Sequence, residues 1–302
     1  MGICQACGTL GISEAVIELD QPTGAAVNLL ELLMLAKQQS EELLILVKTY
    51  PQPSSKHREI TCVASVNRDG ELRRIFPVPF RLLEGEARFK KWWWVRAVVH
   101  KAQNDHRPES HKIDVGTIEH LSEISTKNDW SERRRWYEPH IITNFEELEV
   151  RRQQSGQTLG ILRPVEILGL DITPEKQADW SDEETEKMGR ECLFDDTTVK
   201  NRVPLRKLPF AFHYRYRCPE SEEVIRHRVT DWEVGALYWN CVRSHGSEWQ
   251  KPFRQKLEEE LPGKDLMFLM GTIHRFPDQW LIVGLIYPPK LKKQQQAHLS
   301  FD

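Results

Sequence analysis

Residues 59–78 read EITCVASVNRDGELRRIFPV. From Glu59 to Val66, apolar side chains recur at every second position, which is the period of a β-strand with one buried face. Asn67–Gly70 has the composition of a hairpin turn, and Leu72–Val78 again favours a strand. We therefore predict that Cys62–Val66 and Leu72–Val78 are neighbouring antiparallel strands joined by this turn.

Strand character continues on both sides of this hairpin. Glu42–Tyr50 precedes it and ends at a proline-containing loop, and Lys91–His100 follows it with several Trp and Val residues, which favour strands. Further strands are predicted at 159–172, 210–218, 224–232, 266–274 and 280–287, and helical structure at 25–39, 116–155, 231–241 and 253–261. The predicted fold class is mainly β (α+β), with two OB-like small β-barrels that carry helical insertions.

The chain has 302 residues, which is more than one domain usually holds. An acidic stretch without apolar rhythm separates two strand-rich parts and is typical of a connector. The predicted parts are an N-terminal helical segment at 1–41, a first OB-like β domain with a helical insert at 42–172, the acidic connector at 173–202, a second β-rich domain at 203–290 and a disordered tail at 291–302.

The composition is that of a globular protein, with 39% hydrophobic and 29% charged residues. The longest apolar runs, such as Leu281–Ile286, have the length of a strand and are too short to cross a bilayer. No secretory signal is visible, and six scattered cysteines favour reduced thiols over a disulfide framework. These features predict a cytoplasmic protein without membrane contact.

Charge is distributed unevenly along the chain. The formal net charge of −3 argues against a nucleic-acid partner, because such proteins often carry a basic excess. Basic residues nevertheless outnumber acidic ones from Val47 to Arg107, whereas acidic residues dominate from Asp171 to Asp196. A local basic surface binds phosphate even when the total charge is negative. The ten tryptophans of the chain either fill a β-rich core or stack on bases.

Three segments of the basic region combine cations with aromatic or turn residues. They are KTYPQPSSKHRE (48–59), RRIFPVPFR with KKWWW (73–81 and 90–94), and NDHRPESHKID (104–114). In proteins that bind single strands, Lys and Arg follow the phosphates while aromatic rings stack on bases. The predicted nucleic-acid contacts are Lys48, Lys56, Arg58, Arg73, Arg74, Arg81, Lys90, Lys91, Trp92, Trp94, Arg107 and Lys112. The alternatives are a solvated loop for the first segment, a tryptophan core for the second and a structural Arg–Glu pair for the third.

No metal and no cofactor is predicted, because no complete ligand set has a recognised spacing. Cys4 and Cys7 have the spacing of half a zinc knuckle, and their second pair is missing nearby. Cys218 and His227 form a weak candidate pair that lacks two further ligands in the sequence.

The segment HRVTDWE (227–233) has two interpretations. Asp231 and Glu233 could serve as the paired carboxylates of a metal-dependent nuclease. Asp231 is better placed to cap a helix that begins near Trp232, with Glu233 in the first turn, where the helix dipole favours a negative charge. We predict the capping role.

Several segments resemble a group of uncharacterised bacterial and phage-associated proteins. They are KTYP (48–51), CVASVNRDGELRRIFPVPFR (62–81), RPESHKID (107–114), LGILRPVEILGLDI (159–172), PFAFHYRYRC (209–218), TDWE (230–233) and HRFPDQWLIVGLIYPP (274–289). The second segment also resembles the opening of the dual OB-containing domain family, with Ser65 where that family tends to have Gly. This resemblance implies a pair of OB-like barrels and a role in sensing nucleic acid, in bacterial defence or mobile-element biology.

We therefore expect a protein that binds nucleic acid, single-stranded or structured, without catalytic turnover. One alternative is an enzyme, either a metal-dependent nuclease or a nucleotide-processing protein, that uses Asp231, Glu233 and His227. The other is a protein-interaction subunit of a larger complex, whose partner covers the tryptophans.

Overall fold

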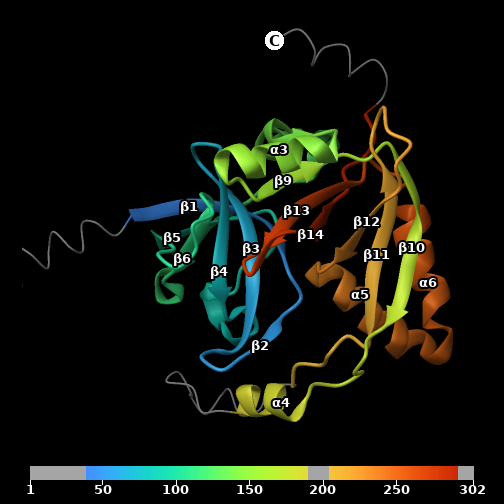
Figure 1. The fold of residues 1–302 in the computed structure, drawn as a ribbon. Coiled ribbons are helices and arrows are strands. Elements are labelled where there is room, and N and C mark those ends of the chain that lie inside the picture. The colour runs from blue at the N-terminus through green and yellow to red at the C-terminus, as the bar shows by residue number, and fades with distance from the viewer. Residues whose placement is uncertain (1–38, 190–203, 292–302) are drawn as a thin grey trace, which may run out of the picture. The chain divides into compact units, whose positions relative to one another are not determined.

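The computed structural model describes residues 39–189 and 204–291 (Figure 1). Several predicted features lie outside the described residues: the N-terminal helical segment up to residue 38 with Cys4 and Cys7, the later part of the connector and the tail from residue 292. No helix within the described ranges is long and apolar enough to cross a membrane.

Five strands close into a barrel in the first part of the chain. They are β1 (Gln39–Lys48), β3 (Arg58–Asn67), β4 (Leu72–Val78), β5 (Trp93–Lys101) and β6 (Ser110–Ile113), with β2 (Gln52–Ser54) added beside β3 and β7 (Glu119–Glu123) beside β5. The spatial order is β1-β3-β4-β6-β5, and β5 pairs back to β1. All neighbours are antiparallel except β4 and β6, which are parallel. The closed barrel is consistent with the OB-like barrel expected from the sequence.

The hairpin predicted from residues 59–78 is confirmed as β3 and β4. The strands are antiparallel, with Val66 opposite Leu72. The side chain of Asn67 holds the turn, because its Oδ1 accepts the N–H groups of the residues two and four positions later, at 3.1 and 2.8 Å. This local bond to the backbone is the physical reason why Asn favours turns.

Apolar side chains from the strands fill the barrel interior. They include Leu43, Ile45, Val63, Ile75, Val95, Ala97 and Val99. Their spacing of two within each strand follows from the alternation of side chains between the two faces. Phe80 and Phe89, from the segment between β4 and β5, complete this core with ring centroids 5.0 Å apart.

The later part of the chain forms a seven-stranded sheet with the order β10-β11-β12-β14-β13-β9-β8. The strands are β8 (Ile141–Ile142), β9 (Leu159–Leu162), β10 (Glu166–Pro174), β11 (Phe210–Arg217), β12 (Ile225–Val229), β13 (Met267–Ile273) and β14 (Phe276–Ile286). The α-helices are α2 (Lys127–Tyr137), α3 (Phe145–Ser155), α4 (Asp182–Gly189), α5 (Trp232–His245) and α6 (Gln250–Arg254). Short helical turns are η1 (Phe80–Leu82), η2 (Gly85–Ala87), η3 (Val115–Thr117), η4 (Glu138–His140), η6 (Gly246–Trp249) and the π-helical η7 (Gln255–Glu260). The predicted α+β, mainly β fold class is confirmed, as one closed barrel and a second sheet.

The strands predicted at 159–172 pair with the second sheet and not with the barrel. β9 pairs with β13, and β10 pairs with β11, so both strands belong to the second sheet. β10 also extends to Pro174, inside the predicted connector, and α4 follows it. The prediction followed adjacency along the chain, whereas the pairing partners of β9 and β10 come from residues 210–273.

The outer faces of β1 and β3 are also apolar and belong to a second core that is shared with the sheet. This shared core includes Leu44, Leu46, Ala64 and Val66 from the barrel and Leu159, Ile161, Met267, Leu269 and Val283 from the sheet. The backbones approach closely at Gly284, where an added Cβ would lie within 2.6 Å of side-chain atoms of Val47. Both faces of β1 and β3 are therefore buried, one inside the barrel and one against the sheet.

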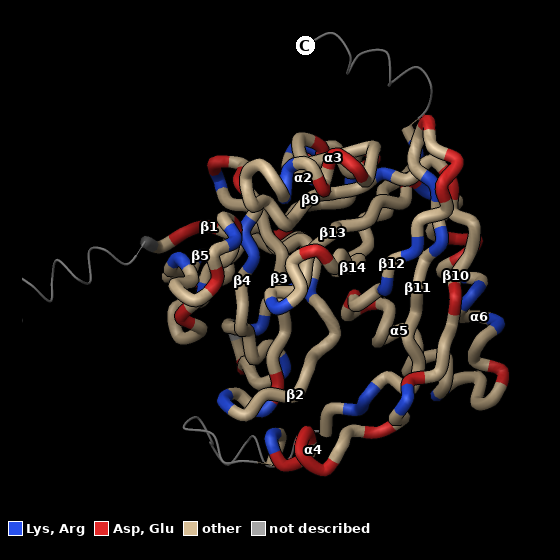
Figure 2. The backbone as a smooth tube through the Cα atoms, viewed as in Figure 1, with Lys and Arg blue, Asp and Glu red and all other residues tan. Residues whose placement is uncertain are grey.

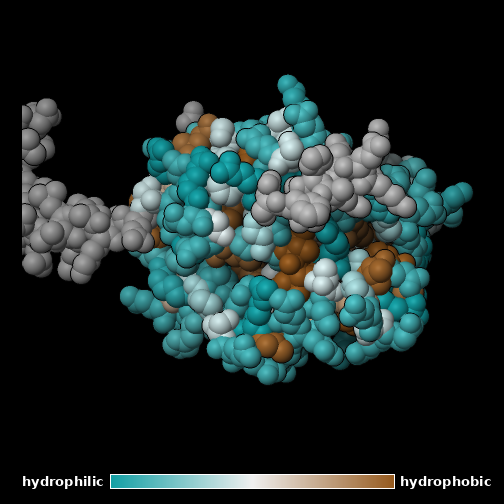
Figure 3. All heavy atoms as spheres, turned by 90° about the horizontal axis from the view of Figure 1, so that it is seen from above, coloured by the Kyte–Doolittle hydropathy of each residue, from teal (hydrophilic) through white to brown (hydrophobic). Residues whose placement is uncertain are grey.

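Charged and apolar residues are mixed over the surface. Basic and acidic residues occur side by side on most elements (Figure 2), so a local excess of charge depends on which side chains meet in space. One face of the molecule is mainly hydrophilic, with hydrophobic residues visible toward its middle (Figure 3).

Candidate ligand-binding cavity

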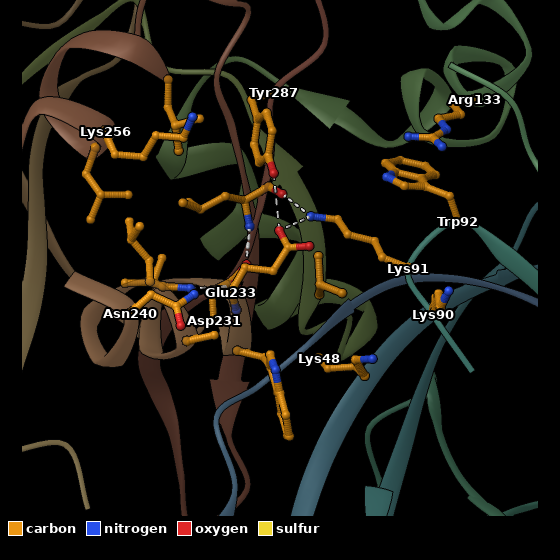
Figure 4. Close-up of a pocket in the computed structure, with 18 of the residues that line it drawn as sticks. Lys48, Lys90, Lys91, Trp92, Arg133, Asp231, Glu233, Asn240, Lys256 and Tyr287 are labelled. Carbon is orange, nitrogen blue, oxygen red and sulfur yellow. Dashed lines mark hydrogen bonds and ion pairs between the residues drawn. The ribbon is translucent and has the colours of Figure 1, made fainter. Parts of the chain in front are cut away.

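A cavity of about 680 Å³ is lined jointly by the barrel and by the segments that follow it (Figure 4). Its wall comes from the end of β1, the segment before β5, α2, the first half of α5, η7 and the region of β14 and its end. The basic lining residues are Lys48, Lys90, Lys91, Arg133 and Lys256, the acidic ones are Asp231 and Glu233, and the aromatic ones are Trp92, Trp130, Trp232 and Tyr287. The volume lies within the range of roughly 300–1,000 Å³ that is common for small-molecule sites.

Trp92, in the wall before β5, has an unusual backbone conformation. Its φ is +66°, a left-handed value that bulky residues rarely adopt. The N–H of Trp92 donates to the carbonyl of Ile45 (2.7 Å), and its own carbonyl accepts the N–H of Ile124 (2.9 Å). Residues held in sparsely populated conformations cluster at functional sites, which draws attention to this wall of the cavity.

Asp231 caps α5, as the sequence predicted. Its Oδ1 accepts the N–H groups of Glu233 (2.5 Å) and Val234 (3.4 Å) in the first turn, where the N–H groups have no acceptor within the helix. Its Oδ2 accepts the N–H of Leu285 in β14 (2.7 Å). Burial raises the pKa of Asp231, and Lys91 and the backbone N–H groups oppose this rise. Both carboxylate oxygens are thus engaged in joining the helix start to the sheet.

Lys91 neutralises the acidic part of the cavity. Its Nζ donates to Glu233 Oε2 (3.0 Å) and to the carbonyl of Leu285 (2.7 Å), as Figure 4 shows. Burial pulls the pKa of Lys91 down, but the charges of Glu233 and Asp231 outweigh it and raise the pKa above its usual value. Lys91 is therefore a charged residue whose partners are already within the protein.

Lys48 has far weaker compensation. Its Nζ lies 3.6 Å from the ring centroid of Phe80, and within the described residues its hydrogen bond goes to the carbonyl of Phe89 at 3.3 Å. Burial lowers the pKa of Lys48 to about 8, with Arg88 and Lys91 adding to the decrease and Glu233 opposing it. A desolvated ammonium group without a carboxylate in contact is a favourable place for an anionic ligand.

Aromatic rings and an arginine form the opposite wall. Trp130 lies 5.5 Å from Trp92 and 6.2 Å from Tyr287, measured between ring centroids. The guanidinium group of Arg133 lies 4.7 Å from the Trp130 ring and 5.0 Å from the Trp92 ring. Its Nε and Nη2 donate to the carbonyl of Ile124, which fixes the group in place. Trp130 and Tyr287 are only partly buried, so both have surface available to a ligand.

The predicted nucleic-acid contacts are divided among several places. Lys48, Lys90, Lys91 and Trp92 line the cavity described above. Lys56, Arg58 and Lys112 line a second cavity of about 680 Å³ near β2 and η1, and Arg81 lines a smaller one of about 200 Å³ with Tyr50 and Trp239. The basic residues expected from the sequence to form one surface therefore line separate cavities.

Arg74 and Arg107, two of the predicted nucleic-acid contacts, have structural partners within the protein. Arg74 is 3% exposed and donates from Nη2 to the carbonyl and hydroxyl oxygens of Thr158 (2.9 and 3.0 Å). Arg107 pairs with Asp105 (2.6 Å) and donates to the carbonyl of Thr272 in β13 (2.7 Å). Both residues join the barrel to the second sheet, a role that requires partners far away in the sequence.

The predicted contacts Trp92, Trp94 and Arg73 also have packing or ion-pair partners within the protein. Trp94 is 3% exposed and packs in the shared core, so it is no exposed platform for a base. Trp92 is buried to the same degree, and only part of it reaches the cavity wall. Arg73 forms ion pairs with Glu41 (3.0 Å) and Glu71 (2.6 Å), so its charge is compensated.

The residues of the nuclease alternative do not meet in one site. Asp231 and Glu233 line the cavity, but His227 accepts or donates a hydrogen bond with the Tyr216 hydroxyl (2.9 Å) and packs on Phe145. Cys218, the other half of the weak metal candidate, is buried. Over the described ranges, no group of three or more His, Cys, Asp and Glu side chains is arranged to hold a metal ion.

Several lining residues were missed by sequence reasoning. Trp130 and Arg133 belong to the run WSERRRWYE (130–138), in which arginines are interleaved with aromatic residues, and this signal could have found them. Lys256 and Tyr287 carry no such signal, since each is an ordinary residue in its own segment and joins the cavity only through the fold.

Two family models match the chain, and they meet between the barrel and the second sheet. The domain of unknown function DUF8758 matches residues 39–139, and the domain of unknown function DUF8757 matches residues 142–301. The chain belongs to the DUF8757 family. The DUF8757 match begins inside β8, so it contains the second sheet except for Ile141. The cavity combines Lys48 and Lys90–Trp92 from the DUF8758 match with α5 and Tyr287 from the DUF8757 match. A search of curated proteins found no match to the chain.

Proposed function

We propose that this protein binds nucleic acid, single-stranded or structured, without catalytic turnover, and that the basic cavity is part of its binding site. The observation that carries the proposal is the weakly compensated Lys48, which shares the cavity with Lys90 and with partly exposed aromatic rings. Proteins that bind single strands use this combination of cations for phosphates and rings for bases. A setting in bacterial defence or mobile-element biology is the biological context that the sequence resemblance suggests.

The barrel connectivity supports the proposal. Taken in chain order without β2, the five strands pair as first-second-third-fifth-fourth and back to the first, with the third and fifth parallel. This order is consistent with an OB-like barrel, a class in which the loop after the first strand is one of the elements that bind oligonucleotides. The loop after the first strand carries Lys56, and the cavity opens beside Lys48 at the end of that strand.

Replacing Lys48 and Lys90 together with Gln should weaken binding to labelled single-stranded 20-mers of any sequence. Each phosphate contact contributes about 0.7 to the slope of log K against log salt for single strands, so the slope should fall by about 1.4. Fluorescence anisotropy over a series of salt concentrations measures both quantities. The matched control replaces Lys176 and Lys251, two exposed lysines outside the cavity, with Gln. Equal weakening in the control, or no binding by the unaltered protein at low salt, contradicts the proposal.

Binding should also depend on pH through Lys48. Burial lowers the pKa of Lys48 to about 8. The positive charges of Arg88 and Lys91 add to this decrease, and the negative charges of Glu233 and Asp231 oppose it. The charged form binds phosphate, so affinity should fall about tenfold from pH 7 to pH 9, whereas a lysine of ordinary pKa loses almost nothing there. Lys48→Arg keeps its charge and should bind equally at both values. The same pH profile in the Arg variant would assign the titration to another group.

A further inference from the structure

The route that a strand takes across an OB barrel is partly closed in this protein. That route crosses the second and third strands, here β3 and β4, and reaches the loop after the fourth strand, here residues 102–109. On β3, Ala64 and Val66 belong to the core shared with the second sheet. Arg74 of β4 is buried against Thr158, and Arg107 of the loop is bound to Thr272. A long strand therefore lacks the continuous groove that an internal stretch of nucleic acid needs.

The cavity that remains has the size of a small ligand. Its volume of about 680 Å³ suits one nucleotide or a little more, judged against the roughly 300–1,000 Å³ of small-molecule sites. The backbone N–H groups at the start of α5 are not its anion site, because Asp231 already accepts the N–H groups of Glu233 and Val234. Of the basic lining residues, Lys91 is paired with Glu233 and Lys256 with Glu260, and Arg133 donates from Nε and Nη2 to the carbonyl of Ile124. Lys48 and the exposed Lys90 have no carboxylate partner among the described residues and are the side chains best placed to meet a phosphate, and the partly exposed rings of Trp130 and Tyr287 can meet a base.

We propose that the cavity holds one nucleotide with a phosphate monoester, as found at the phosphorylated end of a strand, and that the protein recognises such an end rather than an internal stretch. This inference rests on the proposed function. The monoester lies at Lys48 and Lys90, and the base packs against Trp130 and Tyr287. A phosphate monoester carries about −1.5 to −2 charge at pH 7, more than the single charge of an internal phosphodiester, so two cations favour the end. A free nucleoside monophosphate has the same chemistry.

Four forms of one single-stranded DNA sequence test this inference. They are the 5′-phosphorylated, the 3′-phosphorylated, the unphosphorylated and the circular oligonucleotide, each titrated by anisotropy. One of the two phosphorylated forms should bind about tenfold more tightly than the unphosphorylated and circular forms, which is a difference of about 1.4 kcal/mol. Adenosine monophosphate should compete with it, and adenosine should not. The Lys48→Gln/Lys90→Gln variant, checked by thermal melting, should lose the advantage of the phosphorylated end.

Other binding results would contradict end recognition, nucleic-acid binding or both. If the circle binds as tightly as every linear form, end recognition is wrong while nucleic-acid binding stands. If adenosine monophosphate binds but no oligonucleotide does, the cavity is a site for a free nucleotide, and the proposed binding of nucleic acid is wrong. If neither binds, both proposals are wrong.

Tyr287→Leu should weaken binding of the phosphorylated form about tenfold, and Tyr287→Phe should bind it with unchanged affinity, because only the ring is needed for stacking.

Discussion

Replacing Arg74 with Ala should lower the free energy of unfolding by about 3–5 kcal/mol, because it leaves a buried carboxylate without its counter-charge. Arg74 is 3% exposed, and its Nη2 lies 3.5 Å from Oε1 of Glu109, which is itself 5% exposed. Glu109 accepts the N–H of Thr158 (2.9 Å), and Arg74 donates to the carbonyl of Thr158. Loss of the guanidinium group therefore disturbs the whole junction between the barrel and β9.

Urea denaturation followed by tryptophan fluorescence measures this loss. Arg226→Ala is the matched control, because Arg226 is exposed and its bridge to Asp171 (2.8 Å) should contribute less than about 1 kcal/mol. Combining Arg74→Met with Glu109→Leu should recover much of the stability, since an apolar pair leaves no charge buried. If Arg74→Ala instead kept its stability and lost nucleic-acid binding, Arg74 would be a ligand contact after all.

Trp94→Ala should lower the free energy of unfolding by about 3–5 kcal/mol, the usual cost of removing a large aromatic side chain from a core. The Trp94 ring lies 4.8 Å from the Trp136 ring, at an angle of 79°, and Arg68 covers it at 3.7 Å. With 3% of its surface exposed, the ring leaves a cavity that its neighbours only partly fill.

The adjacent residue provides the control for Trp94. Trp93 lies on the other face of β5, is half-buried, and contacts His120 with ring centroids 4.8 Å apart. Trp93→Ala should therefore cost about 1–2 kcal/mol, well below the Trp94 variant. Thermal melting and nucleic-acid binding should be measured on both proteins. Unchanged stability of Trp94→Ala together with weaker binding would restore the stacking role expected from the sequence.

The features that the sequence by itself determined are local ones. The hairpin of β3 and β4 depends on a two-residue alternation and on a turn held by Asn67. The cap of α5 depends on Asp231 and the N–H groups of the next residues. In both cases the interacting groups are within a few positions of one another, so composition and spacing are sufficient to predict them.

The tertiary structure alone decided which basic residues line the cavity. Arg74 and Lys90 both lie in the basic and aromatic region that the sequence singled out, yet Arg74 is bound to Thr158, 84 positions away, and Lys90 lines the cavity. The sheet that β9 joins was decided in the same way, because β9 pairs with β13 across more than a hundred residues. A basic side chain is structural when segments distant in the sequence bury it and provide its hydrogen-bond partners, and it stays accessible when they do not. The local sequence pattern contains no information about those distant segments.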